Sequence, residues 1–143
     1  NGATGLLFSM SGVSVDNDAI WPSIERLVGE LSDMIDVLAG FRSFGDEKNI
    51  QTTYANLGFS IWKGVQFIIK VGANGRRYMI AVNAAISPAR AVWTGLPAGV
   101  KALRSTDGGA RDILVDHRSA SDDFDAFEVH VYLLVYDTVS SKM

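Results

Sequence analysis

The fold is decided by one stretch near the C-terminus, Asp123-Phe124-Asp125-Ala126-Phe127-Glu128-Val129-His130-Val131-Tyr132-Leu133-Leu134-Val135-Tyr136. From residue 127 onward, one face carries Phe127, Val129, Val131, Leu133 and Val135, and the other carries Glu128, His130, Tyr132, Leu134 and Tyr136. A period of two with β-branched and aromatic side chains is typical of a half-buried antiparallel strand. The first of these faces is the apolar one, so we expect a second sheet to cover it.

Length and composition favour one globular domain. The 143 residues, of which 48% are hydrophobic, are enough for a substantial core. A formal net charge of −3 and the lack of Lys/Arg runs argue against binding to nucleic acid or an anionic membrane surface. The absence of cysteine excludes disulfides and thiolate metal sites. No apolar run approaches the roughly 20 residues of a membrane helix. The chain begins at Asn1 without a signal region, so we expect a piece of a longer protein.

A strand and a helix are predicted before the β-rich part. Residues 5–10 (GLLFSM) are nearly continuous in apolar residues, which is typical of a strand covered on both faces. Pro22 suits the first turn of a helix, and Gly40 lies where a left-handed C-terminal cap is expected. Between them, apolar residues step by threes and fours and predict an amphipathic helix over residues 22–39. These residues are Ile24, Leu27, Val28, Leu31, Ile35 and Leu38.

After Asn49 the period changes to two and does not return. We expect strands over residues 51–57, 59–62, 65–71, 77–84, 89–93, 100–104, 112–115 and 128–136. Asn74-Gly75 favours a type I′ hairpin, and residues 96–99 (LPAG) and 107–109 (DGG) mark further turns. Many short strands separated by turns predict a mainly β fold, an antiparallel β-sandwich preceded by one strand and one amphipathic helix.

Several motifs resemble the C-terminal β-sandwich of many glycoside hydrolases. Residues 77–83 (RYMIAVN) form a strand ending in Val-Asn, and residues 96–100 (LPAGV) supply the Leu-Pro turn that follows it in those enzymes. Residues 122–132 (DDFDAFEVHVY) are similar to their closing strand, Asp-x-Phe-x-x-Tyr-x-Val-His-Val-Tyr, with Phe127 where Tyr is usual. Residues 1–8 resemble the last barrel strand of such enzymes, and residues 21–31 resemble the final barrel helix.

The resemblance implies a chain of two parts. Residues 1–44 would be the last β/α unit of a barrel, with its strand at 5–10 and its helix at 22–39, and residues 45–143 would be an accessory sandwich. Catalytic carboxylates of barrel glycosidases lie near the carboxyl ends of earlier strands, which would precede Asn1. The chain would then carry no catalytic residue and would brace a catalytic barrel that it lacks. A secreted or periplasmic location is favoured if the parent enzyme degrades polysaccharide.

A second hypothesis is a free-standing carbohydrate-binding or viral-tip adhesion module. Sugars would stack on the flat faces of Trp62 and Trp93, which each precede a turn and are expected to be exposed. In barrel glycosidases, an aromatic residue that forms one wall of the sugar site often follows the last barrel strand. The resemblance implies that Trp21 could be this residue. The competing interpretation is that these aromatics fill the sandwich core or an interface with the barrel.

Carboxylates offer a possible calcium site. Asp116, Asp122, Asp123 and Asp125 could gather oxygens around this ion, which needs six to eight of them. No known loop spacing supports the site, and a solvated turn is the favoured interpretation. No other cofactor is expected, and Asp16 and Asp18 are best explained as helix caps.

The two histidines are predicted to be non-catalytic. His130 lies on the polar face of the closing strand, which favours a surface or interface residue hydrogen-bonded across the sheet. His117 lies in a polar loop and has no partner at metal-ligand spacing.

Overall fold

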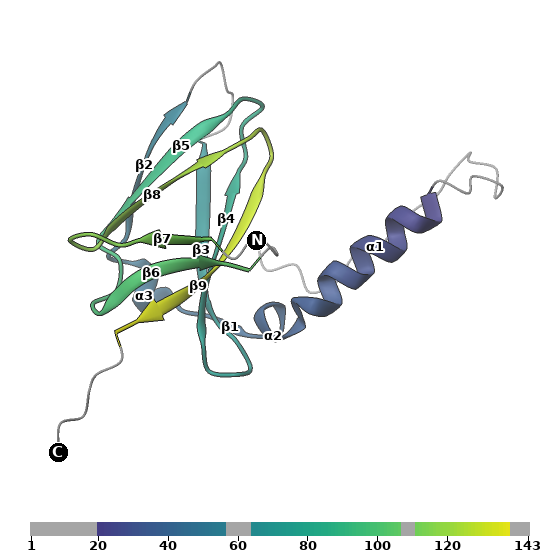
Figure 1. Ribbon diagram of the computed structural model, residues 1–143, viewed down its shortest axis with the longest axis horizontal. Helices are drawn as coiled ribbons and strands as arrows, with labels where there is room; N and C mark the ends of the chain where they lie inside the picture. The colour runs from purple at the N-terminus through teal and green to yellow at the C-terminus, as the bar shows by residue number, and fades with distance from the viewer. Residues whose placement is uncertain (1–19, 57–63, 107–110, 138–143) are drawn as a thin grey trace. The chain divides into compact units, whose positions relative to one another are not determined.

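The computed structural model describes residues 20–56, 64–106 and 111–137 (Figure 1). The described helices are α1 (Ile20–Asp33), α2 (Ile35–Leu38) and α3 (Phe44–Glu47). The described strands are β1 (Phe41–Arg42), β2 (Gln51–Asn56), β3 (Val65–Val71), β4 (Arg77–Asn83), β5 (Ala89–Thr94), β6 (Val100–Ser105), β7 (Asp112–Leu114), β8 (Ser119–Phe124) and β9 (Val129–Tyr136). The strands predicted at residues 5–10 and 59–62 lie outside the described residues.

The strands form two antiparallel sheets. The larger sheet has the order β1-β3-β4-β9-β6-β7, and the smaller one has the order β2-β5-β8. The closing strand β9 lies inside the larger sheet, between β4 and β6, and β5 lies at the centre of the smaller one. The prediction of a mainly β, antiparallel, sandwich-like fold with a helix before the strands is confirmed.

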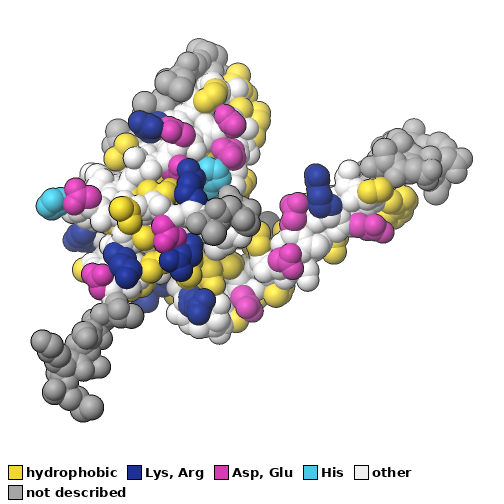
Figure 2. All heavy atoms as spheres, in the orientation of Figure 1, with side chains coloured by type: hydrophobic (Ala, Val, Ile, Leu, Met, Phe, Trp, Pro, Cys, Tyr) yellow, Lys and Arg dark blue, Asp and Glu magenta, His cyan; other side chains and the backbone are white. Residues whose placement is uncertain are grey.

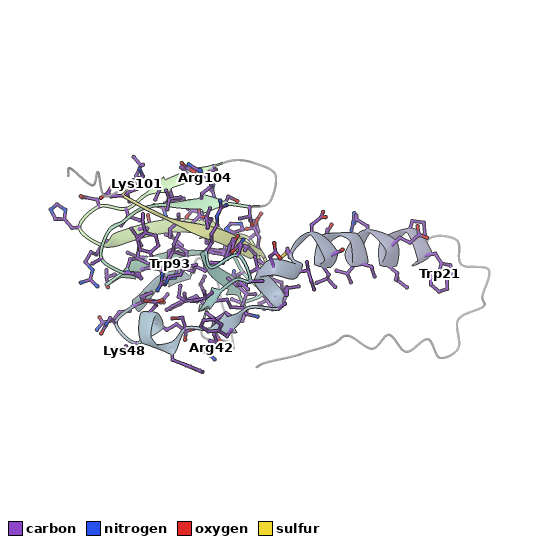
Figure 3. All side chains as sticks on the ribbon, turned by 90° about the horizontal axis from the view of Figure 1, so that it is seen from below. Trp21, Arg42, Lys48, Trp93, Lys101 and Arg104 are labelled. Carbon is purple, nitrogen blue, oxygen red and sulfur yellow. The ribbon has the colours of Figure 1, made fainter. Side chains whose placement is uncertain are left out.

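The sheets share one core. Trp93 of the smaller sheet is fully buried, and its ring lies edge-on to Phe124 at 6.1 Å and to Tyr132 of the larger sheet at 5.9 Å. Figure 3 shows Trp93 in the interior of the sandwich. Truncating such a buried aromatic costs roughly 3–5 kcal/mol, so this residue is a main contributor to the cohesion of the two sheets.

Strand β8 was not predicted. The sequence predicts a solvated turn for Asp122, Asp123 and Asp125, but Asp122 and Asp123 lie in this strand. Residues 119–124 (SASDDF) pair with β5 from Thr94↔Ser119 to Ala89↔Phe124. Ala120, Asp122 and Phe124 alternate as buried residues with exposed Ser121 and Asp123. Pairing with β5 therefore determines that this segment is a strand, because its own composition is too polar to predict one.

The closing strand has the predicted alternation but the opposite buried face. Tyr132 and Leu134 belong to the core between the sheets. On the face predicted to be buried, Val131 is 6% exposed, but Val129 is 52% exposed and Phe127, before the strand, is 59% exposed. His130 is also buried, at 6% exposure. This face points inward because the opposing sheet supplies hydrogen-bond partners for its polar atoms, so Tyr132 buries a large ring at little cost in lost hydration.

The predicted helix over residues 22–39 is divided into α1 and α2 at Met34. The chain forms two compact units, residues 1–35 and residues 36–143, and α1 belongs to the first. Gly40 does not adopt the predicted left-handed conformation. Glycine is needed there because a Cβ atom would collide with the carbonyl oxygen of Val71. None of the described helices is both long and apolar enough to span a membrane.

Residues after α2 are hydrogen-bonded to the larger sheet. β1 pairs with β3, and the backbone N–H of Ser43 donates to the carbonyl of Ile69 at 2.8 Å. The N–H of Ile69 donates in turn to Oε1 of Glu47 at 2.8 Å, so α3 covers part of the β3 edge. The division at residue 44 into barrel end and sandwich stays a prediction.

The turn between β3 and β4 differs from the predicted type I′ hairpin. A type I′ turn needs positive φ at both central residues, but only Gly75 has it, at 74°. The side chain of Asn74 instead accepts a hydrogen bond from the N–H of Arg76 at 2.9 Å, which stabilises a longer turn.

Two glycines with similar φ allow conformational strain to be separated from steric collision. Gly75→Ala should cost roughly 1–2 kcal/mol, because the left-handed region is unfavourable for alanine and a Cβ there meets nothing within 4 Å. Gly95→Ala, at φ 79°, should cost clearly more, since its Cβ would collide with the carbonyl oxygen of Asn49. Urea unfolding followed by circular dichroism measures both, and equal losses would contradict the close approach of Gly95 to Asn49.

Candidate functional site

The densest group of buried polar side chains joins the two sheets. Asp122 lies in the middle of β8 in the smaller sheet, and His130 and Tyr132 are successive inward residues of β9 in the larger sheet. Asp122 and His130 are each 6% exposed and Tyr132 is fully buried. We call these three residues the polar bridge.

One carboxylate oxygen is the centre of the polar bridge. The hydroxyl of Tyr132 donates to Oδ2 of Asp122 at 2.5 Å, a short hydrogen bond of the kind that a charged acceptor makes. Nδ1 of His130 lies 3.1 Å from the same oxygen and 2.8 Å from the Tyr132 hydroxyl. Nη2 of Arg111 also donates to this oxygen, at 2.5 Å. The guanidinium therefore balances the buried negative charge from the solvent side, where its side chain is 53% exposed.

The other nitrogen of His130 faces a second carboxylate. Nε2 lies 3.0 Å from Oε1 of Glu128, and the imidazole stacks on Phe124 with ring centroids 4.4 Å apart. Oε2 of Glu128 accepts the backbone N–H of Asp125 at 2.7 Å. That hydrogen bond lowers the pKa of Glu128, with a smaller contribution from His130, and together they exceed the opposing effect of burial.

This geometry suits cohesion of the sheets and not chemistry on a substrate. Each ring nitrogen of His130 faces a carboxylate, and the residue is almost completely buried, so it cannot offer a base to solvent. The bridge uses both sheets, since the carboxylate comes from one, and the Tyr132 hydroxyl and the His130 imidazole come from the other. Losing one partner of a buried charged pair costs several kcal/mol, so the bridge fixes how the sheets pack.

The Asn of the predicted Val-Asn motif joins two loops beside the bridge. Asn83 is fully buried, and its Nδ2 donates to the carbonyls of Ser87 at 2.8 Å and Asp125 at 2.9 Å. Its Oδ1 accepts the N–H of Ala85 at 3.0 Å. The side chain thus ties the β4–β5 loop to the β8–β9 loop. The motif has a structural role here.

The four aspartates proposed for calcium do not converge. Asp122 belongs to the polar bridge, and Asp123 points to the opposite face of β8, where its oxygens accept from Nε and Nη2 of Arg90 at 2.7 and 2.8 Å. Asp116 lies at a different turn beside His117, and Asp125 is exposed. Across residues 20–56, 64–106 and 111–137, no group of three or more His, Cys, Asp or Glu side chains could hold a metal ion.

The aromatic and histidine predictions have different outcomes. The expectation that Trp93 is exposed is wrong, because the residue is enclosed by both sheets and cannot present a face to a sugar. Trp21, on α1, is 53% exposed, and Trp62 lies outside the described residues, as do Asp16 and Asp18. The expected surface or interface position of His130 is also wrong. His117 lies in a turn, as predicted, and is exposed.

Arg111 and Tyr132 were not singled out from the sequence. Tyr132 alternates with His130 and Leu134, so a buried polar face was visible in principle. Arg111 gives no sequence signal, because it precedes β7 and reaches a carboxylate on a strand that the sequence did not predict.

Comparison with protein-family models, curated proteins and solved structures finds no match to this chain.

Asp122 and Asp123 are neighbours of the same type and allow a matched test of the polar bridge. Asp122→Ala should cost roughly 3–5 kcal/mol, because it leaves buried polar atoms of His130 and Tyr132 without their acceptor. Asp123→Ala should cost at most about 1 kcal/mol, because it removes only an exposed ion pair. Chemical denaturation measures both, and similar costs would show that the bridge is not a main stabilising contact.

The lowered pKa of Glu128 predicts acid sensitivity. A carboxyl group with a lowered folded-state pKa stabilises the fold above its unfolded-state pKa, near 4.3, and loses this contribution as pH falls through the folded value. The difference in unfolding free energy between wild type and Glu128→Gln should therefore shrink as pH falls below about 4.3. Urea titrations between neutral and acidic pH test this, and a difference independent of pH would contradict it.

Proposed function

We propose that this chain is the C-terminal part of a barrel glycoside hydrolase, in which the β-sandwich braces a catalytic barrel that the chain lacks. The observation that carries the proposal is the apolar stripe of α1. Along it, Trp21 and Val28 are each 53% exposed. An amphipathic helix needs a partner for such a stripe, and the partner suggested by the resemblance is the barrel.

The segment that follows these helices offers more apolar surface. Phe41 in β1 is 69% exposed and Phe44 in α3 is 66% exposed. Arg42 lies between them in sequence, with its guanidinium carbon 4.5 Å from the ring centroid of Phe44, and it donates from Nε and Nη2 to Oε1 and Oε2 of Glu47. Exposed phenylalanines held by ordered neighbours are typical of an interface, so they support a bracing role.

The polar bridge supports the same proposal because its histidine is used for structure and not for catalysis. Its histidine has the residue type of a catalytic base, but its position between Asp122 and Glu128 uses it for cohesion of the sheets. Catalysis would then belong to carboxylates of the barrel, as in other barrel glycosidases.

The alternative hypothesis is a free-standing carbohydrate-binding or adhesion module. The burial of Trp93 removes one of its two predicted stacking platforms, so this function would depend on Trp62. A free-standing module would need no barrel partner, whereas the bracing role requires one.

The bracing role predicts that the reading frame upstream of Asn1 encodes a β/α barrel. In that parent enzyme, Val28→Asp should lower the thermal midpoint by about 4 °C or more. Placing a charge in an interface costs a few kcal/mol of stability, and each kcal/mol lowers the thermal midpoint by roughly 2–4 °C in a medium-sized protein.

Gly29→Asp is the matched control, because it adds the same charge one residue away at a position where a Cβ meets nothing within 4 Å. Its thermal midpoint should equal that of the wild type. An upstream frame without a barrel, or equal tolerance of the two substitutions, would count against the proposal.

A further inference from the structure

A pocket of about 370 Å³ lies where β9 continues past the end of its pairing with β4. β4 pairs with β9 up to Tyr78↔Leu133, and β9 then continues beside β6 as far as Val100↔Tyr136. The pocket is lined by Gly75, Arg76, Arg77, Arg104, Leu133, Leu134, Val135 and Tyr136. Arg76 from the β3–β4 turn, Arg77 from β4 and Arg104 from β6 thus surround one hollow, on either side of β9, in a protein of net negative charge.

Two of the three arginines already have carboxylate partners. Nε of Arg77 lies 2.8 Å from Oδ2 of Asp46, and Nε and Nη2 of Arg104 each donate to Asp112 at 2.8 Å. Arg76 is exposed and has no carboxylate partner within the described part of the chain. One positive charge therefore remains unbalanced at the pocket, which suits a monoanion better than a dianionic phosphate ester.

The other residues that line the pocket are suited to contact the apolar part of an organic ligand. Leu133 and Val135 are half-buried, and the ring of Tyr136 lies under the guanidinium of Arg77, with 5.9 Å between the guanidinium carbon and the ring centroid. Burial raises the pKa of Tyr136, so its phenol stays neutral and can donate a hydrogen bond at neutral pH.

The arginines are available from the surface. Figure 3 shows Arg104 at the outside of the sandwich, and Figure 2 shows dark blue side chains around yellow ones on this part of the sandwich. Arg104 uses the donors of Nε and Nη2 on Asp112, which leaves other guanidinium N–H groups for a ligand. An arginine fork matches the planar geometry of a carboxylate.

We propose that this pocket binds a small organic monocarboxylate, anchored by Arg76 and flanked by Arg77 and Arg104. The apolar floor of Leu133 and Val135 takes the body of the ligand, and the phenol of Tyr136 donates to it. That the acid is a sugar acid, such as a uronic acid unit, rests on the proposed function, whereas the carboxylate site itself does not.

Titration of the full chain of residues 1–143 with D-glucuronate, followed by amide NMR shifts, tests the site. We expect saturable shifts at Arg76 and Val135, and a loss of affinity of about tenfold or more in Arg76→Gln, as for one charged hydrogen bond. Lys101→Gln is the matched control, because it removes the same charge at an exposed residue of β6 that does not line the pocket.

Two control ligands, glucose and sulfate, and the substitution Arg76→Gln distinguish specific carboxylate binding from other binding. Neutral glucose or inorganic sulfate binding as well as glucuronate would overturn the proposal, as would an Arg76→Gln protein that binds like the wild type. Tighter binding of an oligouronate identifies a polymer unit as the source, and binding of the monomer alone identifies a free acid. Because no barrel takes part, failure here leaves the bracing role untouched, and failure of the bracing role leaves this site standing.

Discussion

The packing of the two sheets depends on a single carboxylate oxygen. Oδ2 of Asp122 accepts from Tyr132 of the opposite sheet and from Arg111 at the rim, and it lies within hydrogen-bond distance of His130. A buried carboxylate without such partners would be too costly to keep charged. Apolar contacts such as those of Trp93 hold the sheets together without direction. The hydrogen bonds to Asp122 have direction, so they fix the register of one sheet over the other.

Strand positions were largely predictable because local patterns and turn residues agree. The prediction for residues 65–71 coincides with β3, and those for β4, β5, β6, β7 and β9 differ by a residue or so at the ends. Strand β8 was missed because Ser121, Asp122 and Asp123 favour turns locally. Its pairing with β5 and the partners of Asp122 come from residues distant in sequence, which no local pattern contains.

The buried face of β9 was mispredicted for the same reason. Counting side chains by polarity makes the Val129 face the apolar one, yet His130 and Tyr132 become inexpensive to bury once Asp122 is opposite them. The pattern of β9 alone therefore shows that His130 and Tyr132 share a face, but it does not show Asp122 opposite them. The motifs quoted from the sequence nevertheless contain Asn83, Asp122, His130 and Tyr132, which make the buried polar contacts.

The shortness of the connection between Asp122 and its partners affects how the chain folds. Asp122 lies only eight residues from His130 and ten from Tyr132, although the two strands belong to different sheets. The entropy lost in closing a loop grows with its length, so this arch is among the least costly ways to join the sheets from an unfolded chain. The pairing of β4 with β9 closes a loop several times longer. The connection that is hardest to recognise in the sequence is thus among the easiest for the chain to find by diffusion.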